Sequence, residues 1–198
     1  MKTARIYTND FNRIISATKA FISSDTRRIE ANYIKLEFNA DESIVTATAI
    51  DGCRVSVEHS VISNCDENFT AYIKPNVKLP NRSFAEFILD GVDSDELIIR
   101  CNGFIFGYTQ PKIKDRLDTD KIVQNIISKK PNLRITFNGN YLLSALQAAK
   151  ASAGDSFRNP VVFEFTTPID PVVIKTNKAD VKIVLPMRTK TEEENKQK

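Results

Sequence analysis

The chain has 198 residues, which corresponds to one large domain or two small ones. Hydrophobic residues make up 41% and charged residues 27%, so a disordered chain, a collagen-like chain and a coiled-coil rod are excluded for most of the length. The net charge of +3 permits a nucleic-acid partner without requiring one, because affinity for phosphates depends on Lys and Arg gathered on one face.

The N-terminal part of the sequence predicts a β-α-β-β-β unit. A strand over residues 4–7 is followed by Thr8, Asn9 and Asp10, each of which can cap a helix through a side-chain oxygen. Apolar residues then recur with helical spacing and predict an amphipathic helix: Phe11, Ile14, Ile15, Phe21 and Ile22. Thr18 interrupts this stripe, and we expect its hydroxyl to bond back to the preceding turn. Three segments then alternate with period two and predict strands: residues 33–38, 43–49 and 54–59.

A second group of strands follows, with a weak helix or none. The strands are predicted over residues 69–73, 84–89, 97–101 and 104–108. Between the first two lies a segment bounded by Pro75 and Pro80, which is too short for more than one turn of helix. The charge-rich residues after these strands contain one apolar cluster, at Ile122, Val123, Ile126 and Ile127. We interpret residues 113–130 as a connector.

The opening pattern then returns clearly, in the third of three successive units. A strand over residues 133–137 precedes a cap region, Asn138-Gly139-Asn140, and a helix whose apolar stripe consists of Leu142, Leu143, Leu146 and Ala149. Strands follow over residues 161–165, 171–175 and 181–185. The β-α-β-β-β pattern is therefore present twice clearly and once in degraded form, as an internal repeat of about 60 to 75 residues.

These elements predict the division of the chain and its exposed strand edges. We expect one domain over residues 1–112, a domain or half-domain over residues 131–188, and a disordered polar tail over residues 189–198. The strands over residues 97–101 and 181–185 are candidates for edge strands that pair between subunits.

The few cysteines and the single histidine exclude most metal and nucleophile chemistry. Cys53, Cys65, Cys101 and His59 match no zinc-ligand spacing. Alternation places His59 at the end of a strand, where a packed or half-exposed histidine is more common than a catalytic one. No phosphate-binding glycine motif occurs. We therefore expect no metal, no cofactor and no catalytic residue.

The N-terminal segment and the hydropathy predict the location of the protein. No run approaches the about 18 consecutive apolar residues that a membrane span requires. Residues 1–11 mix Lys, Arg, Asn and Asp with apolar residues, unlike a signal peptide. We therefore expect a cytoplasmic protein without a membrane partner.

Two short segments carry a resemblance to a known family. Residues 47–55 read A-T-A-I-D-G-C-R-V, and residues 181–188 read V-K-I-V-L-P-M-R. The first resembles the A-T-D-G-H-R-L turn in the middle domain of the bacterial DNA polymerase III beta subunit, the sliding clamp. The second resembles the V-x-P-M-R ending of that family. Residues 137–146 are similar to the family's F-N-x-x-Y-L-L-D-A-L helix, and residues 168–174 to its P-L-x-P-V-L-I hairpin.

The resemblance implies an α+β, DNA-clamp-like fold built from β-α-β-β-β repeats. It covers most of residues 5–188 in order, although at least one domain of a bacterial clamp is absent. Residues 1–112 resemble the family's middle domain. The sequence departs from the family pattern at Cys53, where the family has histidine, at Ile50, where it has threonine, and at Thr189, where leucine is usual.

In the family, the two motif segments line one pocket for short peptides of polymerases and other partners. The resemblance therefore implies ten peptide-binding residues: Asp51, Gly52, Cys53, Arg54, Val55, Val184, Leu185, Pro186, Met187 and Arg188. We expect Met187 to adapt to varied side chains, and Arg54 and Arg188 to orient polar groups of the peptide. The competing interpretation is that the apolar members of this set are ordinary core residues.

A clamp holds a polymerase at DNA by enclosing the duplex, so the resemblance also implies double-stranded DNA as a partner, without sequence preference, and a homo-oligomer that closes into a ring. The candidate DNA contacts on or near the predicted helices are Arg13, Lys19, Arg27, Arg28 and Lys150. Each can also belong to an ordinary solvated face.

Two alternatives to a processivity factor stay open. The first is a clamp-fold protein-interaction module that keeps the pocket without encircling DNA. The second is an enzyme that uses a carboxylate cluster at Asp115, Asp118 and Asp120, although a solvated charge run is the more common role of such residues in a connector.

Overall fold

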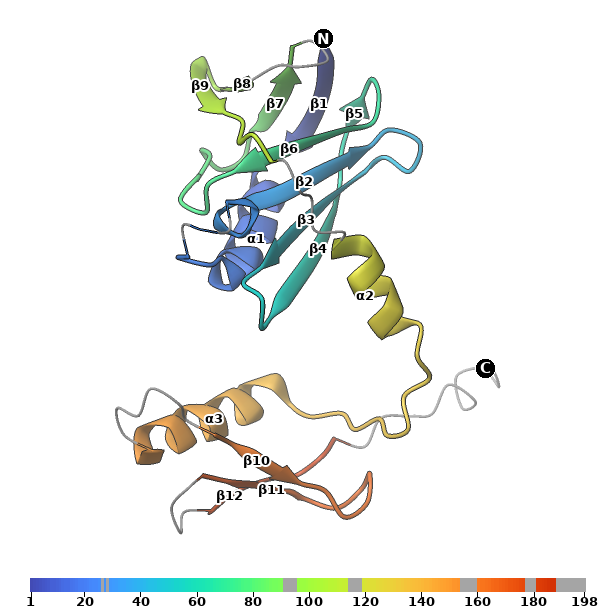
Figure 1. Ribbon diagram of the computed structural model, residues 1–198, viewed down its shortest axis with the longest axis vertical. Coiled ribbons are helices and arrows are strands. Elements are labelled where there is room, and N and C mark those ends of the chain that lie inside the picture. The colour runs from blue at the N-terminus through green and yellow to red at the C-terminus, as the bar shows by residue number, and fades with distance from the viewer. Residues whose placement is uncertain are drawn as a thin grey trace. The chain divides into compact units, whose positions relative to one another are not determined.

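The computed structural model describes residues 1–25, 27, 29–90, 96–113, 119–153, 160–176 and 181–187. The chain divides into two compact units, Met1–Gln124 and Asn125–Lys198 (Figure 1). The predicted connector contains a helix, α2 (Thr119–Ile127), whose side chains of Ile122, Ile126 and Ile127 are exposed. The predicted tail over residues 189–198 lies outside the described residues.

Among its described residues, unit 1 contains two antiparallel sheets, the helix α1 and the first part of α2. Its elements are β1 (Lys2–Tyr7), α1 (Thr8–Thr18), the 3₁₀ turns Lys19–Phe21 and Glu30–Asn32, β2 (Ile34–Asn39), β3 (Ile44–Ile50), β4 (Val55–Val61), β5 (Asn64–Cys65), β6 (Phe69–Ile73), β7 (Phe84–Leu89), β8 (Glu96–Cys101) and β9 (Phe104–Thr109). One sheet has the strand order β5-β1-β7-β8-β9 and the other β4-β3-β2-β6. Together they confirm the α+β class.

Each sheet of unit 1 contains strands from both repeats. The first strand of the first repeat, β1, pairs with β7 of the second repeat, and the first strand of the second repeat, β6, pairs with β2 of the first. In the first repeat, β1 and β2 therefore lie in different sheets, one before the helix and one after it. In the second repeat, β6 and β7 also lie in different sheets, on the two sides of the segment that takes the place of the helix. The inward-facing residues of these strands form one continuous core in unit 1.

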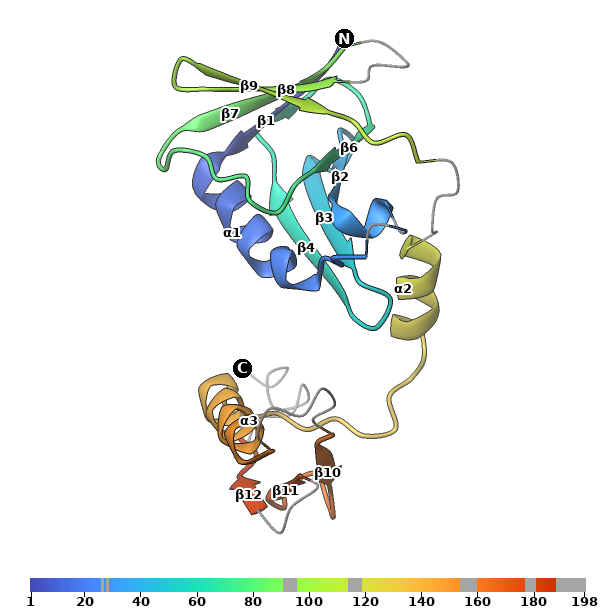
Figure 2. The same cartoon turned by 60° about the vertical axis from the view of Figure 1, so that its left-hand side comes forward.

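Helix α1 packs on β3 and β4 (Figure 2). The side chains of Phe11, Ile14 and Ile15 are buried, and each contributes about 1.5 to 3 kcal/mol by leaving water. The prediction that Phe21 and Ile22 belong to the same helix is wrong, because α1 ends at Thr18 and both side chains, which lie beyond its end, are only partly buried. The expected role of Thr18 is confirmed: its hydroxyl is buried and donates to the Ile14 carbonyl at 2.8 Å.

The segment between β6 and β7 is bound along the start of α1. The Asn12 side chain makes two hydrogen bonds to the Leu79 backbone. Its Nδ2 donates to the Leu79 carbonyl at 2.8 Å, and its Oδ1 accepts from the Leu79 N–H at 3.0 Å. The prediction that this segment holds no long helix is confirmed.

The predicted capping of α1 is wrong. The N-cap is Tyr7, and no side chain caps the helix. Asn9 Oδ1 instead accepts from the Arg82 N–H at 2.9 Å, and Thr8 Oγ1 accepts from the Ser83 N–H at 3.1 Å. These oxygens bind the segment before β7 because the backbone N–H groups of that segment lie beside the start of α1 and require acceptors.

The described residues of unit 2 form one repeat. It contains α3 (Gly139–Ala153), which lies along one face of a sheet with the order β10-β11-β12 (Figure 1). Its strands are β10 (Val162–Glu164), β11 (Val172–Lys175) and β12 (Val181–Val184). The predicted strand over residues 133–137 is reduced to one bridge, Phe137 to Pro186, because no second strand lies beside it among the described residues.

One predicted sheet edge is wrong and the other is correct. The strand over residues 97–101, β8, is internal, because β7 and β9 pair with its two sides. The edge of that sheet is β9 instead. β12 lies at an edge of its sheet, as predicted. None of the helices that the structure describes is long and apolar enough to span a membrane.

We expect Asn12→Ala to lower the free energy of unfolding by about 1 to 3 kcal/mol, because it leaves both backbone groups of the buried Leu79 without their partners. Urea unfolding followed by circular dichroism measures this. Asn81→Ala is the control, because it removes only an exposed bond to Asn12, and we expect a change within about 0.5 kcal/mol. Equal midpoints for both variants would contradict the assigned role of Asn12.

Candidate functional site

A groove of about 800 Å³ lies between α3 and the end of β12. Both walls come from unit 2. The helix wall consists of Asn138, Tyr141, Ser144, Ala145 and Ala148, and the strand wall of Lys182, Ile183, Val184, Leu185, Pro186 and Met187. Four of the ten predicted peptide-binding residues, Val184 to Met187, are therefore brought together in one concave surface.

Backbone contacts hold the strand wall beside the start of α3. The bridge between Phe137 and Pro186 is antiparallel, and the Met187 N–H donates to the Thr136 carbonyl at 2.7 Å. Proline at position 186 fixes its own φ, so the chain leaves β12 in one direction. Asn138 then starts the helix, because its Oδ1 accepts from the Asn140 N–H at 3.0 Å. The predicted cap region is confirmed.

The groove exposes large apolar side chains to solvent. Leu185 is 68% exposed, Met187 50% and Tyr141 66%, whereas Val184 is 5% exposed. The interpretation as ordinary core therefore applies to Val184 but not to Leu185 or Met187. Exposed apolar side chains that line one concavity are typical of a binding surface.

The helix wall was missed by the sequence analysis. The motif at residues 137–146 predicted only a helix with an apolar stripe. Leu142, Leu146 and Ala149 of that stripe do pack in the core of unit 2, but the fourth predicted member, Leu143, is wrong, because it is exposed on another face of the helix. Tyr141, Ser144 and Ala148 are spaced by three and four residues, so they share a second face of the same helix. That spacing, read together with the motif, is the signal that could have found them.

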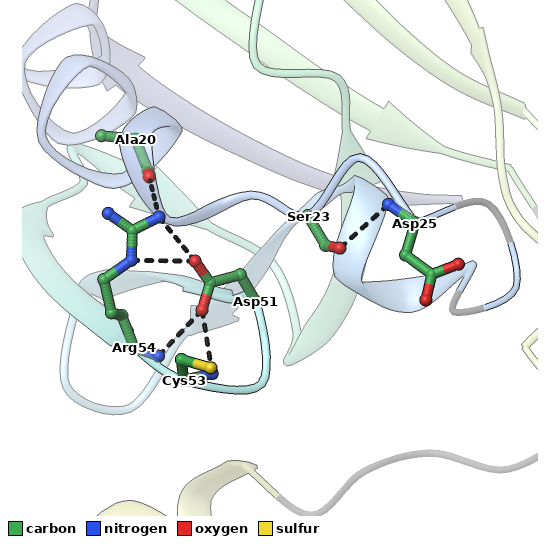
Figure 3. Close-up of polar contacts among 6 residues, drawn as sticks. All are labelled: Ala20, Ser23, Asp25, Asp51, Cys53 and Arg54. Carbon is green, nitrogen blue, oxygen red and sulfur yellow. Dashed lines mark hydrogen bonds and ion pairs between the residues drawn. The ribbon is translucent and has the colours of Figure 1, made fainter. Parts of the chain in front are cut away.

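The other predicted segment forms a tight turn between β3 and β4 in unit 1. Asp51 Oδ1 accepts from the backbone N–H groups of Cys53 and Arg54, at 2.9 and 2.8 Å (Figure 3). Gly52 has a φ of 92°, which a residue with a side chain rarely adopts. Cys53 is exposed at the tip of the turn, and Val55 begins β4.

Arg54 holds this turn against the end of the first helical segment. Its Nε donates to Asp51 Oδ2 at 2.8 Å, and its Nη2 donates to the Ala20 carbonyl at 3.0 Å (Figure 3). The guanidinium also lies over the Phe21 ring, 5.3 Å from its centre. Much of the hydrogen-bonding capacity of Arg54 is therefore used inside unit 1 rather than left for a peptide.

The environment of Asp51 favours its charged form. The hydrogen bonds from the Cys53 N–H and from the Arg54 side chain lower the pKa of the Asp51 carboxyl, and burial opposes this to a smaller extent. The turn is therefore held by an ionised carboxylate at neutral pH.

The two predicted walls lie in different units. The turn at residues 51–55 belongs to unit 1 and the groove residues 184–187 to unit 2. That they line one pocket stays a prediction. Arg188, the last member of the set, lies outside the described residues.

The candidate DNA contacts differ in how their charges are used. Arg13 pairs with Glu58 at 3.1 Å and donates to the His59 carbonyl, and Arg27 pairs with Asp25 at 2.9 Å. Lys19 and Lys150 are exposed, and no ion pair involves them in the part of the chain that the structure describes. Arg28 lies outside that part.

Metal-ligand geometry is not present in the described ranges: no group of three or more His, Cys, Asp or Glu side chains there could hold an ion. His59 is exposed on β4, and its Nδ1 lies 3.1 Å from Thr46 Oγ1. The acidic residues Asp115 and Asp118 and the side chain of Asp120 lie outside the described residues.

Comparison with solved structures shows that the chain has the sliding-clamp fold. It matches a sliding clamp of Bacillus subtilis with a TM-score of 0.75 at 16% identity, over 93% of this chain and 49% of that chain. A protein of Eubacterium rectale assigned to the DNA polymerase III beta subunits gives a TM-score of 0.79 at 9% identity, over 93% and 50%. No family model and no curated protein matches the sequence.

A third match has a bound peptide. The Helicobacter pylori beta clamp in complex with a DNA ligase peptide gives a TM-score of 0.69 at 12% identity, over 93% of this chain and 49% of that chain. The chain therefore spans about half the length of these three proteins.

We expect the stability of unit 1 to fall on acidification through the titration of Asp51. Because the pKa of Asp51 is lowered by folding, its contribution is complete above the ordinary carboxyl pKa of about 4 and is lost as the pH falls through the lower, folded value. Asp51→Asn should therefore unfold more easily at neutral pH and lose less stability between pH of about 5 and 2. Urea midpoints across this pH range test this prediction.

Asp41→Asn is the matched control, because Asp41 is exposed in the turn between β2 and β3. If Asp51→Asn and Asp41→Asn show the same pH dependence as the unmodified protein, Asp51 does not hold the turn through its charge.

Proposed function

We propose that the protein is a sliding-clamp-like processivity factor that encircles double-stranded DNA and binds short peptide motifs of a DNA polymerase and other replication proteins. Such a protein acts by topology and by docking, so the proposal includes no catalytic residue, metal or cofactor. The clamp fold and the open apolar groove support it together.

The groove between α3 and Met187 is the observation that carries the proposal. It presents exposed apolar side chains on a wall that is fixed by the Phe137 to Pro186 bridge. Little conformational entropy is therefore lost in the site when a peptide binds. An extended peptide with one or two large apolar anchors can reach a Kd of about 1 μM in such a groove, which is about 8 kcal/mol. The ligase peptide bound by the Helicobacter pylori clamp provides a precedent for this kind of partner.

DNA contact in this proposal is weak and sequence-blind. Lysine side chains such as those of Lys19 and Lys150 attract phosphates without reading base edges, which suits a protein that slides. The ring itself requires several copies of the chain, joined so that the assembly closes.

A second candidate function is favoured by one specific observation. Arg13 and Arg27 have carboxylate partners within unit 1, which reduces the positive charge available to phosphates. This fits a clamp-fold interaction module that binds peptides without encircling DNA.

We expect Met187→Ala to weaken peptide binding about 10-fold, because it removes an exposed apolar wall of the groove while the side chains of the unit 2 core stay in place. The ligase peptide from the Helicobacter pylori complex, labelled with a fluorophore, is a suitable first probe in fluorescence anisotropy. Leu143→Ala is the matched control, since Leu143 is exposed on α3 but does not line the groove. Equal affinity of Met187→Ala and the unmodified protein would remove the groove from the peptide site.

We expect the double variant Lys19→Glu, Lys150→Glu to bind duplex DNA at least about 10-fold more weakly at about 50 mM salt, because phosphate contacts are lost and like charges are introduced. Duplexes of unrelated sequence should bind equally well to the unmodified protein. Lys129→Glu, Lys130→Glu is the matched control, because both lysines are exposed after α2. If the unmodified protein binds no duplex under these conditions, the interaction module is the better description.

A further inference from the structure

Unit 1 shows how two repeats of this fold complete each other. The first strand of each repeat lies beside the second strand of the other, as β1 does beside β7 and β6 beside β2. The registers agree as well. Ile6, the last inward-facing residue of β1, lies opposite Ala85 at the start of β7, and Ile73 of β6 lies opposite Ile34 at the start of β2.

Unit 2 contains the same two kinds of strand but no second repeat among its described residues. Residues 133–137 correspond to the first strand, because they directly precede α3. The bridge from Phe137 to Pro186, which lies beyond β12, matches the pairing of β1 with β5, which lies beyond β4. On their other side, residues 133–137 pair with no strand that the structure describes. Among the described strands β10 pairs only with β11, so one edge of β10 is open as well.

The exposed fractions of the side chains show that this edge lacks a cover. Phe163 of β10 lies opposite the fully buried Ile174, so it is on the face that α3 covers, and Phe165 shares that face by alternation. These two rings are nevertheless 38% and 45% exposed. The corresponding inward positions of β2, Ile34 and Leu36, are both 0% exposed because β6 covers the edge of their strand.

The core of unit 2 is correspondingly small. Its buried cluster consists of Ala149, Val172, Ile174 and Val184, whereas the cluster of unit 1 has 22 buried members among the described residues. A helix on three strands with so few buried side chains gains little free energy from burial to offset the loss of chain entropy. Further burial against another surface would supply the missing stabilisation.

We propose that two copies of the chain associate through unit 2, with residues 133–137 of each copy pairing antiparallel with β10 of the other. A second copy supplies both missing neighbours at once, because each copy offers one free first strand and one free second strand. The interface is isologous, and the pair of half-domains reproduces the arrangement that unit 1 builds from its own two repeats.

The register of unit 1 fixes the expected register between the copies. By analogy with Ile6 opposite Ala85, Phe137 of one copy lies opposite Phe163 of the other. Thr136 then lies opposite Glu164, on the outward face, and Ile135 lies opposite Phe165. The two exposed phenylalanines of each copy are thereby buried.

This inference deepens the oligomer included in the proposed function, but it rests on the fold alone, since the mass of the assembly is measured without DNA or peptide. A dimer of this kind that binds no duplex would retain the inference and count against the clamp function. An oligomer that binds duplex DNA but assembles through edges other than residues 133–137 and β10 would do the opposite.

The first test is the mass of the full chain in solution, by light scattering after size exclusion at about 20 μM protein. We expect twice the mass of one chain or an even multiple of it. Phe165→Lys should reduce the mass twofold, because it places a charge in the paired face. The control is Ile169→Lys, at a more exposed apolar residue in the turn between β10 and β11, and it should leave the mass unchanged.

The second test is a disulfide between copies, which decides the matter even if Phe165→Lys fails to fold. Thr136→Cys with Glu164→Cys, in a background of Cys53→Ser and Cys65→Ser, should give a covalent dimer on mild oxidation. The pair Thr136→Cys with Ile169→Cys should not. A strictly monomeric mass would overturn the proposal, since the edge would then be covered within the chain or by a different protein. An oligomer that forms no disulfide at the first pair and tolerates Phe165→Lys would overturn it as well.

Discussion

The fold depends on one constraint on backbone hydrogen bonding. Within a β-α-β-β-β repeat, the strand before the helix and the strand after it enter different sheets, so their backbone groups cannot hydrogen-bond to each other. A repeat therefore leaves one strand edge open in each sheet, and a second repeat must close both. Unit 1 meets this constraint with its own two repeats and gains one continuous core. Unit 2 has one repeat in its described residues and keeps exposed phenylalanines beside the open edge.

Periodicity in the sequence was sufficient to predict most elements. The strands β6 and β7 were predicted with the bounds that the structure has, and Phe11, Ile14 and Ile15 of α1 are buried as their spacing indicated. The cap of α1 was not predictable in the same way, because the backbone groups that bind Thr8 and Asn9 lie more than 70 residues away in the sequence. The edge of the larger sheet was assigned to β8 instead of β9 for a related reason: alternation is the same in an internal and an edge strand, and only the pairing order distinguishes them.

The candidate site was predicted from motifs rather than from periodicity. The segment from Val184 to Met187 was found in this way, and three of its four side chains line the groove with large exposed or partly exposed surfaces. Its partner wall on α3 was missed because the helix was interpreted only through its core-facing stripe. The role of Arg54 could not be predicted from the motif either. Its guanidinium binds the Ala20 carbonyl, which is 34 residues earlier in the sequence, and so its charge serves the turn.

The groove and the proposed contact between copies use opposite sides of residues 133–137. On one side, the Thr136 carbonyl accepts from the Met187 N–H and Phe137 bridges to Pro186, which fixes the strand wall of the groove. The free side is the one that faces β10 of a second copy in the proposed interface. A peptide in the groove and a second copy at the edge therefore do not compete for the same backbone groups. Pairing on the free side would instead hold residues 133–137 more firmly, and with them the groove wall that Met187 completes, because an extended segment with neighbours on both sides has fewer open conformations than one with a single bridge.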